Sequence, residues 1–129
     1  MPSARLKEMY IKVIFQLSQQ SGSVRAIDIA RRMHVSKASV HRAVKHLDKE
    51  GYIDHAPYGH ISLTLIGIKT GLELCARQET VAAYLMATLS IGRDAAEEEA
   101  CRLEHVVSHE SIEKMREHLR ACRYGRRCE

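Results

Sequence analysis

The stretch AIDIARRMHVSKASVHRAVKHLDKE, residues 26–50, decides the fold of this chain. Apolar residues recur at helical spacing in two runs, residues 26–33 and about residues 37–50. Ser36 can cap the second run through its side-chain oxygen, and Gly51 suits the left-handed position that often ends a helix. The stretch therefore predicts two helices joined by a three-residue turn.

The second of these helices is amphipathic. Val40, Val44 and Leu47 form its apolar stripe, and Ala30 in the first helix is small enough to let the two helices approach closely. Val35 fills the turn between them. The opposite face of the second helix presents polar and basic side chains to solvent: Ser36, Lys37, Ser39, His41, Arg42 and Lys45.

Two short β-prone runs follow, residues 52–56 and residues 60–64, around a Pro-Tyr-Gly tip at residues 57–59. They predict a β-hairpin. Helix, turn, helix and hairpin in this order are typical of a winged helix-turn-helix, whose second helix enters the major groove of DNA by its N-terminus.

DNA contacts can be assigned within this unit. Arg42 can read guanine through a bidentate pair, whereas Lys37 and Ser39 are better placed for phosphates or sugars. Tyr58 and His60, on the hairpin, could touch the DNA backbone or the minor groove. The sequence therefore predicts double-stranded DNA as a partner.

The charge of the chain is divided along its length. Residues 1–75 carry 11 Lys or Arg against 6 Asp or Glu, whereas residues 76–119 carry 5 against 9. A basic first half joined to an acidic middle is typical of a DNA-binding domain followed by a segment that binds cations or a partner. A helix-turn-helix that contacts proteins, with ordinary solvated charges, remains the alternative.

The rest of the chain is predicted to be helical apart from one early loop at residues 18–23. The apolar periodicity indicates further helices over residues 6–19, 65–90, 94–107 and 110–121. The predicted fold class is mainly α, with a winged helix-turn-helix followed by an all-helical domain.

Four potential metal ligands lie close together in the acidic part of the chain: Glu97, Cys101, Glu104 and His105. Their spacings of four, three and one place them on one face of the predicted helix. A thiolate, an imidazole and carboxylates form half of a coordination shell for a divalent transition metal. The other ligands must come from another helix, and Met9 offers a soft thioether. The alternative is a buried cysteine beside a surface Glu–His pair.

Several segments resemble the diphtheria toxin repressor family of iron-dependent repressors and its shorter, manganese-responsive relatives. The most specific is EACRLEHVVS, residues 99–108, and residues 7–15, 28–30 and 51–53 agree with it. The resemblance covers residue 5 to about residue 119. It implies a repressor that binds a palindromic operator as a homodimer and controls genes of metal homeostasis.

The resemblance also implies the domains and the metal site. We expect a DNA-binding domain at residues 1–71, a dimerisation and metal-binding domain at residues 72–122, and a flexible tail rich in Arg and Cys at residues 123–129. The residues that match the family's primary site are Met9, Cys101, Glu104 and His105.

The chain departs from the family at the ancillary metal site. Gln78 stands where the family usually has a ligand His, and Ala82 where it often has a ligand Glu. We therefore expect this second site to be impaired, with the acids at positions 79, 97 and 98 as the available substitutes. In addition, we expect the chain to lack the SH3-like domain of the long iron repressors.

The ligand types bear on the choice of metal. Met9, Lys12 and Cys101 stand where the manganese type has three acids. Because a cysteine and a methionine favour Fe²⁺ over Mn²⁺, we predict Fe²⁺ as the physiological metal. Mn²⁺ is the alternative, and Co²⁺, Ni²⁺ and Zn²⁺ are expected to bind in vitro.

Other functions fit the sequence less well. An enzyme with Cys101 as nucleophile and His105 as base lacks a third orienting residue and an oxyanion-hole loop. A regulator that responds to thiol redox state instead of metal remains open. Without a signal peptide or an apolar span we expect a cytoplasmic protein whose cysteines are thiols or ligands. Cys75 is expected to be a small buried residue, and Cys122 and Cys128 have no assigned role.

Overall fold

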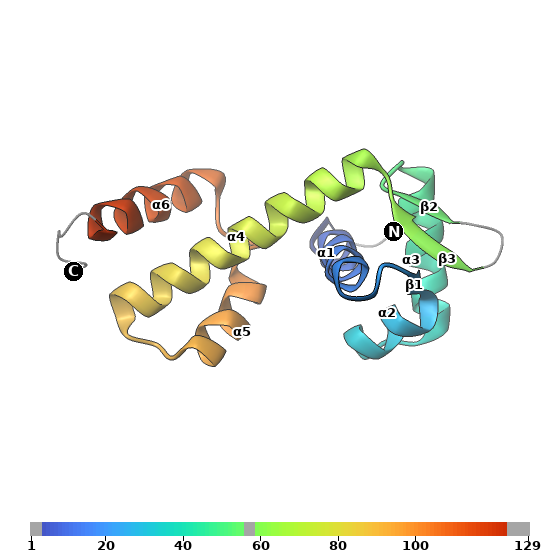
Figure 1. Ribbon diagram of the computed structural model, residues 1–129, viewed down its shortest axis with the longest axis horizontal. Coiled ribbons are helices and arrows are strands. Elements are labelled where there is room, and N and C mark those ends of the chain that lie inside the picture. The colour runs from blue at the N-terminus through green and yellow to red at the C-terminus, as the bar shows by residue number, and fades with distance from the viewer. Residues whose placement is uncertain (1–3, 56–58, 124–129) are drawn as a thin grey trace. The chain divides into compact units, whose positions relative to one another are not determined.

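The computed structural model of the chain describes residues 4–55 and 59–123 (Figure 1). Its contacts divide the chain between Glu73 and Leu74 into an N-terminal unit and a C-terminal unit. The described residues form six helices and three strands, which confirms the predicted, mainly helical fold class.

The N-terminal unit is a winged helix-turn-helix, as the sequence predicts. Its helices are α1 (Ala4–Ser21), α2 (Ala26–Met33), α3 (Lys37–Lys49) and the first turns of α4 (Leu65–Leu89). Its strands are β1 (Val24–Arg25), β2 (Ile53–His55) and β3 (His60–Leu63). They form an antiparallel sheet in the order β1-β3-β2, and β2 and β3 are the predicted hairpin, here called the wing.

Local backbone geometry fixes both ends of α3. His34, in the turn before it, adopts a left-handed conformation with φ of 56°. Ser36 Oγ accepts a hydrogen bond from the Ser39 amide at 3.1 Å, which confirms the predicted cap. After the helix, Gly51 has φ of 88°, a conformation that favours glycine.

Large apolar side chains close the core of the N-terminal unit. Val40, Val44 and Leu47 are buried as predicted, with exposed fractions of 0%, 2% and 1%. The first helix and the sheet complete this core, since α1 contacts α2, α3 and β3. Their buried residues are Tyr10, Ile11, Ile14, Phe15, Val24, Ile53 and Ile61.

The first turns of α4 pack against this core through two glycines. A Cβ atom at Gly67 would lie 2.1 Å from the backbone oxygen of Tyr52, and one at Gly71 would lie 2.7 Å from the side chain of Phe15. Both are far inside van der Waals contact. The start of α4 can therefore approach the wing and α1 only because these positions lack a side chain.

The beginning of the chain differs from the prediction in two places. The helix continues through Ser21, so the expected loop at residues 18–23 is wrong for residues 18–21. Nothing in that polar run breaks the backbone ladder before Gly22, whose φ of 74° ends the helix. Strand β1 is not predicted at all, because two residues are too few to show a period.

The C-terminal unit consists of the rest of α4, α5 (Arg93–Leu103) and α6 (His109–Arg123). Ser108 Oγ accepts a hydrogen bond from the Ser111 amide at 3.1 Å and so caps α6. Small and medium side chains form the buried cluster of the unit: Val81, Ala82, Leu85, Ala96, Ala100 and Ile112. No helix in the described ranges is long and apolar enough to cross a membrane.

Helix α5 ends four residues earlier than predicted, at Leu103. Residues 104–107 form a turn in which the Val106 amide donates to the Leu103 carbonyl at 3.0 Å. This short-range bond tightens the end of the helix. Glu104 and His105 therefore lie just after the end of α5, although the Glu104 amide still donates to the Ala100 carbonyl at 3.0 Å, as within a helix. Their common face with Glu97 stays a prediction.

The cysteines differ in state. Cys75 and Cys101, both half-buried, are not in a disulfide, whereas Cys122 is disulfide-bonded. The expectation that the cysteines are thiols or metal ligands is therefore wrong for Cys122. Cys128 lies outside the described residues.

Candidate functional site

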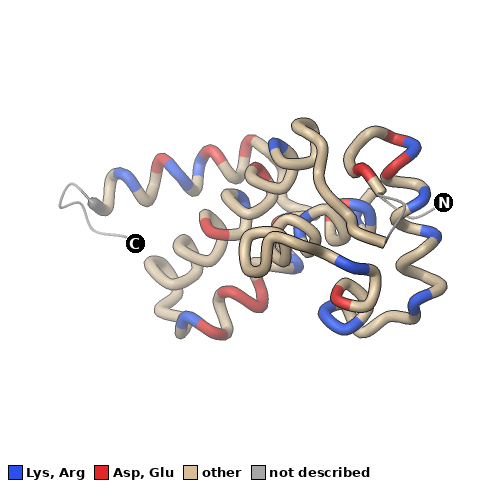
Figure 2. Tube along the Cα trace, turned by 45° about the vertical axis from the view of Figure 1, so that its right-hand side comes forward, with Lys and Arg blue, Asp and Glu red and all other residues tan. Residues whose placement is uncertain are grey.

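The outward face of α3 carries basic side chains, and Figure 2 marks where Lys and Arg residues lie along the chain. Lys37, His41, Arg42 and Lys45 are all exposed there, as is the cap residue Ser36. Their side chains are directed away from the buried stripe of the same helix. A helix with such a face can enter the major groove, where Lys and Arg neutralise phosphates.

Ser39 is engaged within α3 instead of pointing freely outward. It is half-buried, and its Oγ accepts hydrogen bonds from the Ser36 hydroxyl at 3.0 Å and from Arg42 Nη2 at 3.5 Å. The second bond restrains the guanidinium of Arg42. Ser39, predicted to contact phosphate or sugar, therefore also lies within long hydrogen-bond distance of the side chain predicted to read guanine.

On the wing, the structure describes one of the two predicted contact residues. His60 is exposed, and its Nδ1 lies 2.6 Å from the hydroxyl of Ser23, just before β1. This hydrogen bond links the imidazole to the neighbouring strand and leaves Nε2 available for another contact. Tyr58 lies outside the described residues.

A polar network joins α1 to the end of α3. Lys7 Nζ lies 2.6 Å from Glu50 Oε2, and His46 Nε2 lies 2.7 Å from Glu50 Oε1. The hydrogen bond between Lys7 and Glu50 raises the pKa of the lysine and lowers the pKa of the carboxyl. The ammonium of Lys7 also lies 5.4 Å from the ring centre of Tyr52. The network therefore holds α1 beside α3 and the start of the wing.

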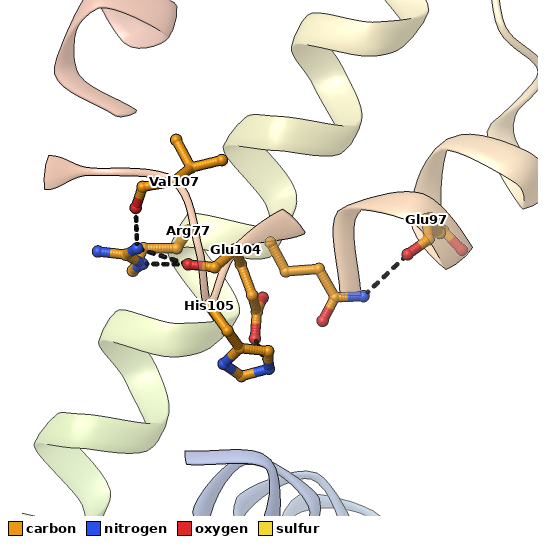
Figure 3. A network of polar contacts seen from close by, with 6 residues as sticks. Arg77, Glu97, Glu104, His105 and Val107 are labelled. Atoms are coloured by element: carbon orange, nitrogen blue, oxygen red, sulfur yellow. Dashed lines mark hydrogen bonds and ion pairs between the residues drawn. The ribbon is translucent and has the colours of Figure 1, made fainter. Parts of the chain in front are cut away.

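The C-terminal unit brings two of the predicted metal ligands together. Glu104 Oε1 lies 3.2 Å from His105 Nε2, and both side chains are completely buried (Figure 3). A buried carboxylate is costly unless hydrogen bonds or opposite charges compensate it. This pair is the core of the candidate metal site.

The structure places the other two predicted ligands, Glu97 and Cys101, within α5. Glu97 is exposed, and its backbone carbonyl accepts a hydrogen bond from Gln78 Nε2 at 3.4 Å. Cys101 is half-buried in the last turns of α5. Among the residues that the structure describes, no three His, Cys, Asp or Glu side chains are arranged to hold a metal ion.

The Glu104–His105 pair nevertheless fits a metal ion. Two donors that bind one ion at about 2.0–2.2 Å are separated by roughly 3 Å, close to the observed distance. One oxygen and one imidazole nitrogen suit a divalent first-row metal. The pair amounts to half of a coordination shell, so further donors are needed.

Arg77 is a residue of this site that the sequence analysis missed. Its guanidinium donates hydrogen bonds to the carbonyl oxygens of Glu104 and Val107, in the turn that carries the pair (Figure 3). The sequence does not reveal this role, because Arg77 bonds to backbone carbonyls, which every residue type has.

Both halves of the chain match family models. Residues 4–61 match the iron dependent repressor, N-terminal DNA binding domain, and residues 64–127 match the metal binding and dimerisation domain of the same family. The Escherichia coli O157:H7 transcriptional regulator MntR is 31% identical over 107 residues, which are 83% of this chain and 68% of that protein.

Solved structures agree with these matches. The chain superimposes on T. acidophilum IdeR with a TM-score of 0.80 and 26% identity, over 99% of this chain and 58% of that one. It superimposes on the manganese regulator SloR with a TM-score of 0.76 and 31% identity, over 88% of this chain and 53% of that one. The chain thus spans little more than half of either solved protein.

Proposed function

This chain belongs to the iron-dependent repressor family of metal-dependent transcriptional repressors, and we propose that it represses metal-homeostasis genes as a metal-activated homodimer on a palindromic operator. The family's members regulate transcription and are not enzymes, which sets the cysteine-nucleophile hypothesis aside. The observation that carries the proposal is the buried Glu104–His105 pair, a carboxylate and an imidazole at ligand separation. We propose that the protein acts in the cytoplasm, where its operator lies.

We propose that α3 reads the operator through the major groove. Arg42, restrained by Ser39, is assigned to a guanine edge, where a bidentate pair contributes about 1–3 kcal/mol of discrimination. The other exposed side chains of α3 and the wing are assigned to phosphates or sugars, which position the protein without reading sequence. They are Ser36, Lys37, His41, Lys45, His60 and Tyr58.

Homodimer formation is supported by the matched dimerisation domain and by apolar surface. Within residues 64–127, Leu89 is 62% exposed and Val106 is 66% exposed. Isolated exposed apolar side chains are common, but Leu65, Ile68 and Leu72 are also exposed, at positions i, i+3 and i+7 of α4, and such a stripe is typical of an interaction surface. Two copies related by a twofold axis would present two copies of α3 to the two halves of a palindrome.

The proposed metal ligands come from both units. Glu104 and His105 are assigned from their geometry, Cys101 from its place in the preceding helix, and Met9 from the family resemblance alone. Exposed Glu97 is a subsidiary candidate. A bound cation would supply the free energy that selects the DNA-binding arrangement, and a full reversal of populations takes about 5 kcal/mol.

We propose Fe²⁺ as the physiological metal because the assigned ligands include a thiolate and a thioether. Mn²⁺ prefers oxygen and imidazole donors. Mn²⁺ is nevertheless a second candidate, since one of the similar solved proteins is a manganese regulator and Glu104 and His105 suit either ion.

One experiment tests DNA binding and metal choice together. Operator sites are first selected from random duplex DNA under anaerobic conditions, and binding is then measured with Fe²⁺, Mn²⁺, Zn²⁺ or chelator. We expect binding with Fe²⁺ and little with chelator. Binding with Mn²⁺ but not Fe²⁺ would replace the iron assignment. Binding that responds only to thiol oxidation would support a redox regulator.

The ligand assignment is tested by single variants. Cys101→Ala and Glu104→Ala should lose the metal-dependent increase in operator affinity while the proteins stay dimeric. Lys114→Ala, an exposed position in α6, serves as the control. Full metal dependence in both ligand variants would refute the site.

A further inference from the structure

The guanidinium of Arg77 makes three hydrogen bonds to the turn that carries Glu104 and His105. Nε and Nη2 donate to the Glu104 carbonyl at 3.2 and 2.5 Å, and Nη2 also donates to the Val107 carbonyl at 2.6 Å. Figure 3 shows the guanidinium reaching from α4 to both ends of the turn. One side chain thus holds the first and last residues of the segment that carries the pair.

The two carbonyls need such a donor. Helix α5 ends at Leu103 and α6 begins at His109, so the chain turns between them. At a helix end the last carbonyls lack the amide partners that a continuing helix would provide. A cation at this end also interacts favourably with the helix dipole. Arg77 satisfies both requirements at once.

Arginine is suited to this contact in a way that lysine is not. Its guanidinium is planar and presents several N–H groups in a fixed fork, which can address two carbonyls with defined angles. An ammonium is a compact point charge on a flexible stem. Replacing the fork with a point charge would leave at least one of the two carbonyls less well held.

We infer that Arg77 is a positioning residue for metal binding: it fixes the turn so that Glu104 and His105 are held at ligand separation before the metal arrives. This inference rests on the proposed function, since it assigns a purpose to the same pair. Without the hydrogen bonds from Arg77, the turn samples other conformations. Metal binding must then order the turn as well, which lowers the affinity. Groups that orient metal ligands typically change metal affinity by roughly 10–100-fold when removed.

The chain offers a matched control in Arg116 of α6. This half-buried arginine donates to Thr80 Oγ1 at 3.3 Å and pairs with Glu113 at 2.5 Å, so it also links α6 to α4. Among the described residues its hydrogen bonds go to Thr80 and Glu113, outside the turn at residues 104–107. Arg116→Ala therefore removes a comparable side chain from the same unit without releasing the turn.

The test uses the full chain and Co²⁺ as the probe, followed under anaerobic conditions by its visible absorption. The variants are Arg77→Ala, Arg77→Lys and Arg116→Ala, and amide hydrogen exchange of Val106 and Val107 is measured on the metal-free proteins. We expect the Kd for Co²⁺ to rise roughly 10–100-fold in Arg77→Ala, less in Arg77→Lys, and little in Arg116→Ala. Exchange should accelerate in the turn of the Arg77 variants only.

Each outcome of this test either supports or contradicts the positioning role of Arg77. Unchanged Co²⁺ affinity in Arg77→Ala, or an equal loss in Arg77→Ala and Arg116→Ala, would overturn the positioning role. Should Arg77→Ala fail to fold, Arg77→Lys decides on the same criteria. If the wild type itself binds no Co²⁺, the proposed metal site fails and this inference with it, a result recognisable because the wild type is then indistinguishable from the Glu104→Ala variant.

Discussion

The N-terminal unit closes its core around large side chains, whereas the C-terminal unit is built on small ones. Ile11, Ile14 and Phe15 are buried with Val40 and the rest of the α3 stripe in the first unit. Three of the six residues in the buried cluster of the second unit are alanines. Because buried apolar area scales with side-chain size, the second unit gains less from its own core.

The two units also differ in what they leave exposed. The first presents the basic face of α3, and the start of its α4 also leaves large apolar side chains exposed, with Leu65 at 85% and Ile66 at 61%. The second leaves Leu89 and Val106 exposed and carries the buried Glu104–His105 pair, half of a coordination shell. Both units therefore leave apolar side chains that a partner could cover, and the buried pair gives the second unit a feature whose occupation by a metal would change its stability.

The strongest test of this contrast compares one buried isoleucine in each unit, Ile14→Ala and Ile112→Ala. Their exposed fractions are 0% and 1%, and such a change typically costs about 2–5 kcal/mol. We expect Ile14→Ala to abolish DNA binding in any metal. Ile112→Ala should make DNA binding depend less on metal and on dimerisation, while the first unit stays folded. Urea unfolding followed by residue-resolved amide signals measures both.

That comparison fails if Ile112→Ala shifts the unfolding of both units by the same amount. The two units would then unfold as one cooperative system. The stability of the C-terminal unit would depend no more on a partner or a metal than that of the N-terminal unit.

A second test addresses the start of α4, which belongs to the first unit. Gly67→Ala places a Cβ against the backbone oxygen of Tyr52, where no flexible side chain can yield. We expect a loss of about 1–3 kcal/mol in the free energy of unfolding of the first unit. Ala83→Gly, at an exposed position in α4, controls for effects on the helix alone. Equal stability of Gly67→Ala and wild type would contradict the close packing.

A third test separates sequence reading from phosphate binding on α3. Arg42→Ala should relax base preference at one operator position, at a cost of about 1–3 kcal/mol. Lys45→Ala should weaken binding to all sequences alike and lower the salt slope by about one. Ser39→Ala should resemble a mild Arg42→Ala, because it removes the hydroxyl that restrains the guanidinium. Selection from partly randomised operators measures the preference, and identical profiles for Arg42→Ala and Lys45→Ala would contradict these roles.

The smallest expected effect concerns the ion pair between Lys7 and Glu50. The lowered pKa of Glu50 means that its contribution to stability is present above the ordinary carboxyl pKa and lost as the pH falls through the folded value. The pKa of Lys7 is raised, so its contribution to stability is present below the ordinary lysine pKa. That contribution is lost as the pH rises through the folded-state pKa. Thermal unfolding should show that Glu50→Gln lowers Tm near neutrality and that the difference vanishes in acid. A constant difference would point to a cause other than the charge.

Periodicity and caps were enough to predict most elements of the fold. Val40, Val44 and Leu47 repeat at helical spacing, Ser36 caps α3, and Gly51 has the left-handed backbone expected of it. These features involve residues that are close together in the chain, so they can be predicted from the sequence. Strand β1 was missed because its two residues form only through pairing with β3.

The candidate metal site was predictable only in part. Glu104 and His105 were named as candidates from the sequence, but the end of α5 at Leu103 was not predicted. The residues around the turn contain no glycine or proline that would mark it. The turn instead depends on hydrogen bonds from Arg77, which is 27 residues distant from Glu104 in the chain.

The sequence by itself determined the winged helix-turn-helix, the basic face of its second helix and the set of residues from which metal ligands can be drawn. All of these follow from residue type and short-range spacing. Only the tertiary structure decided that Glu104 and His105 lie after α5 as a buried pair and that Arg77 holds the turn that carries them. Both depend on how α4 and this turn pack against each other, which spacing along the chain does not specify.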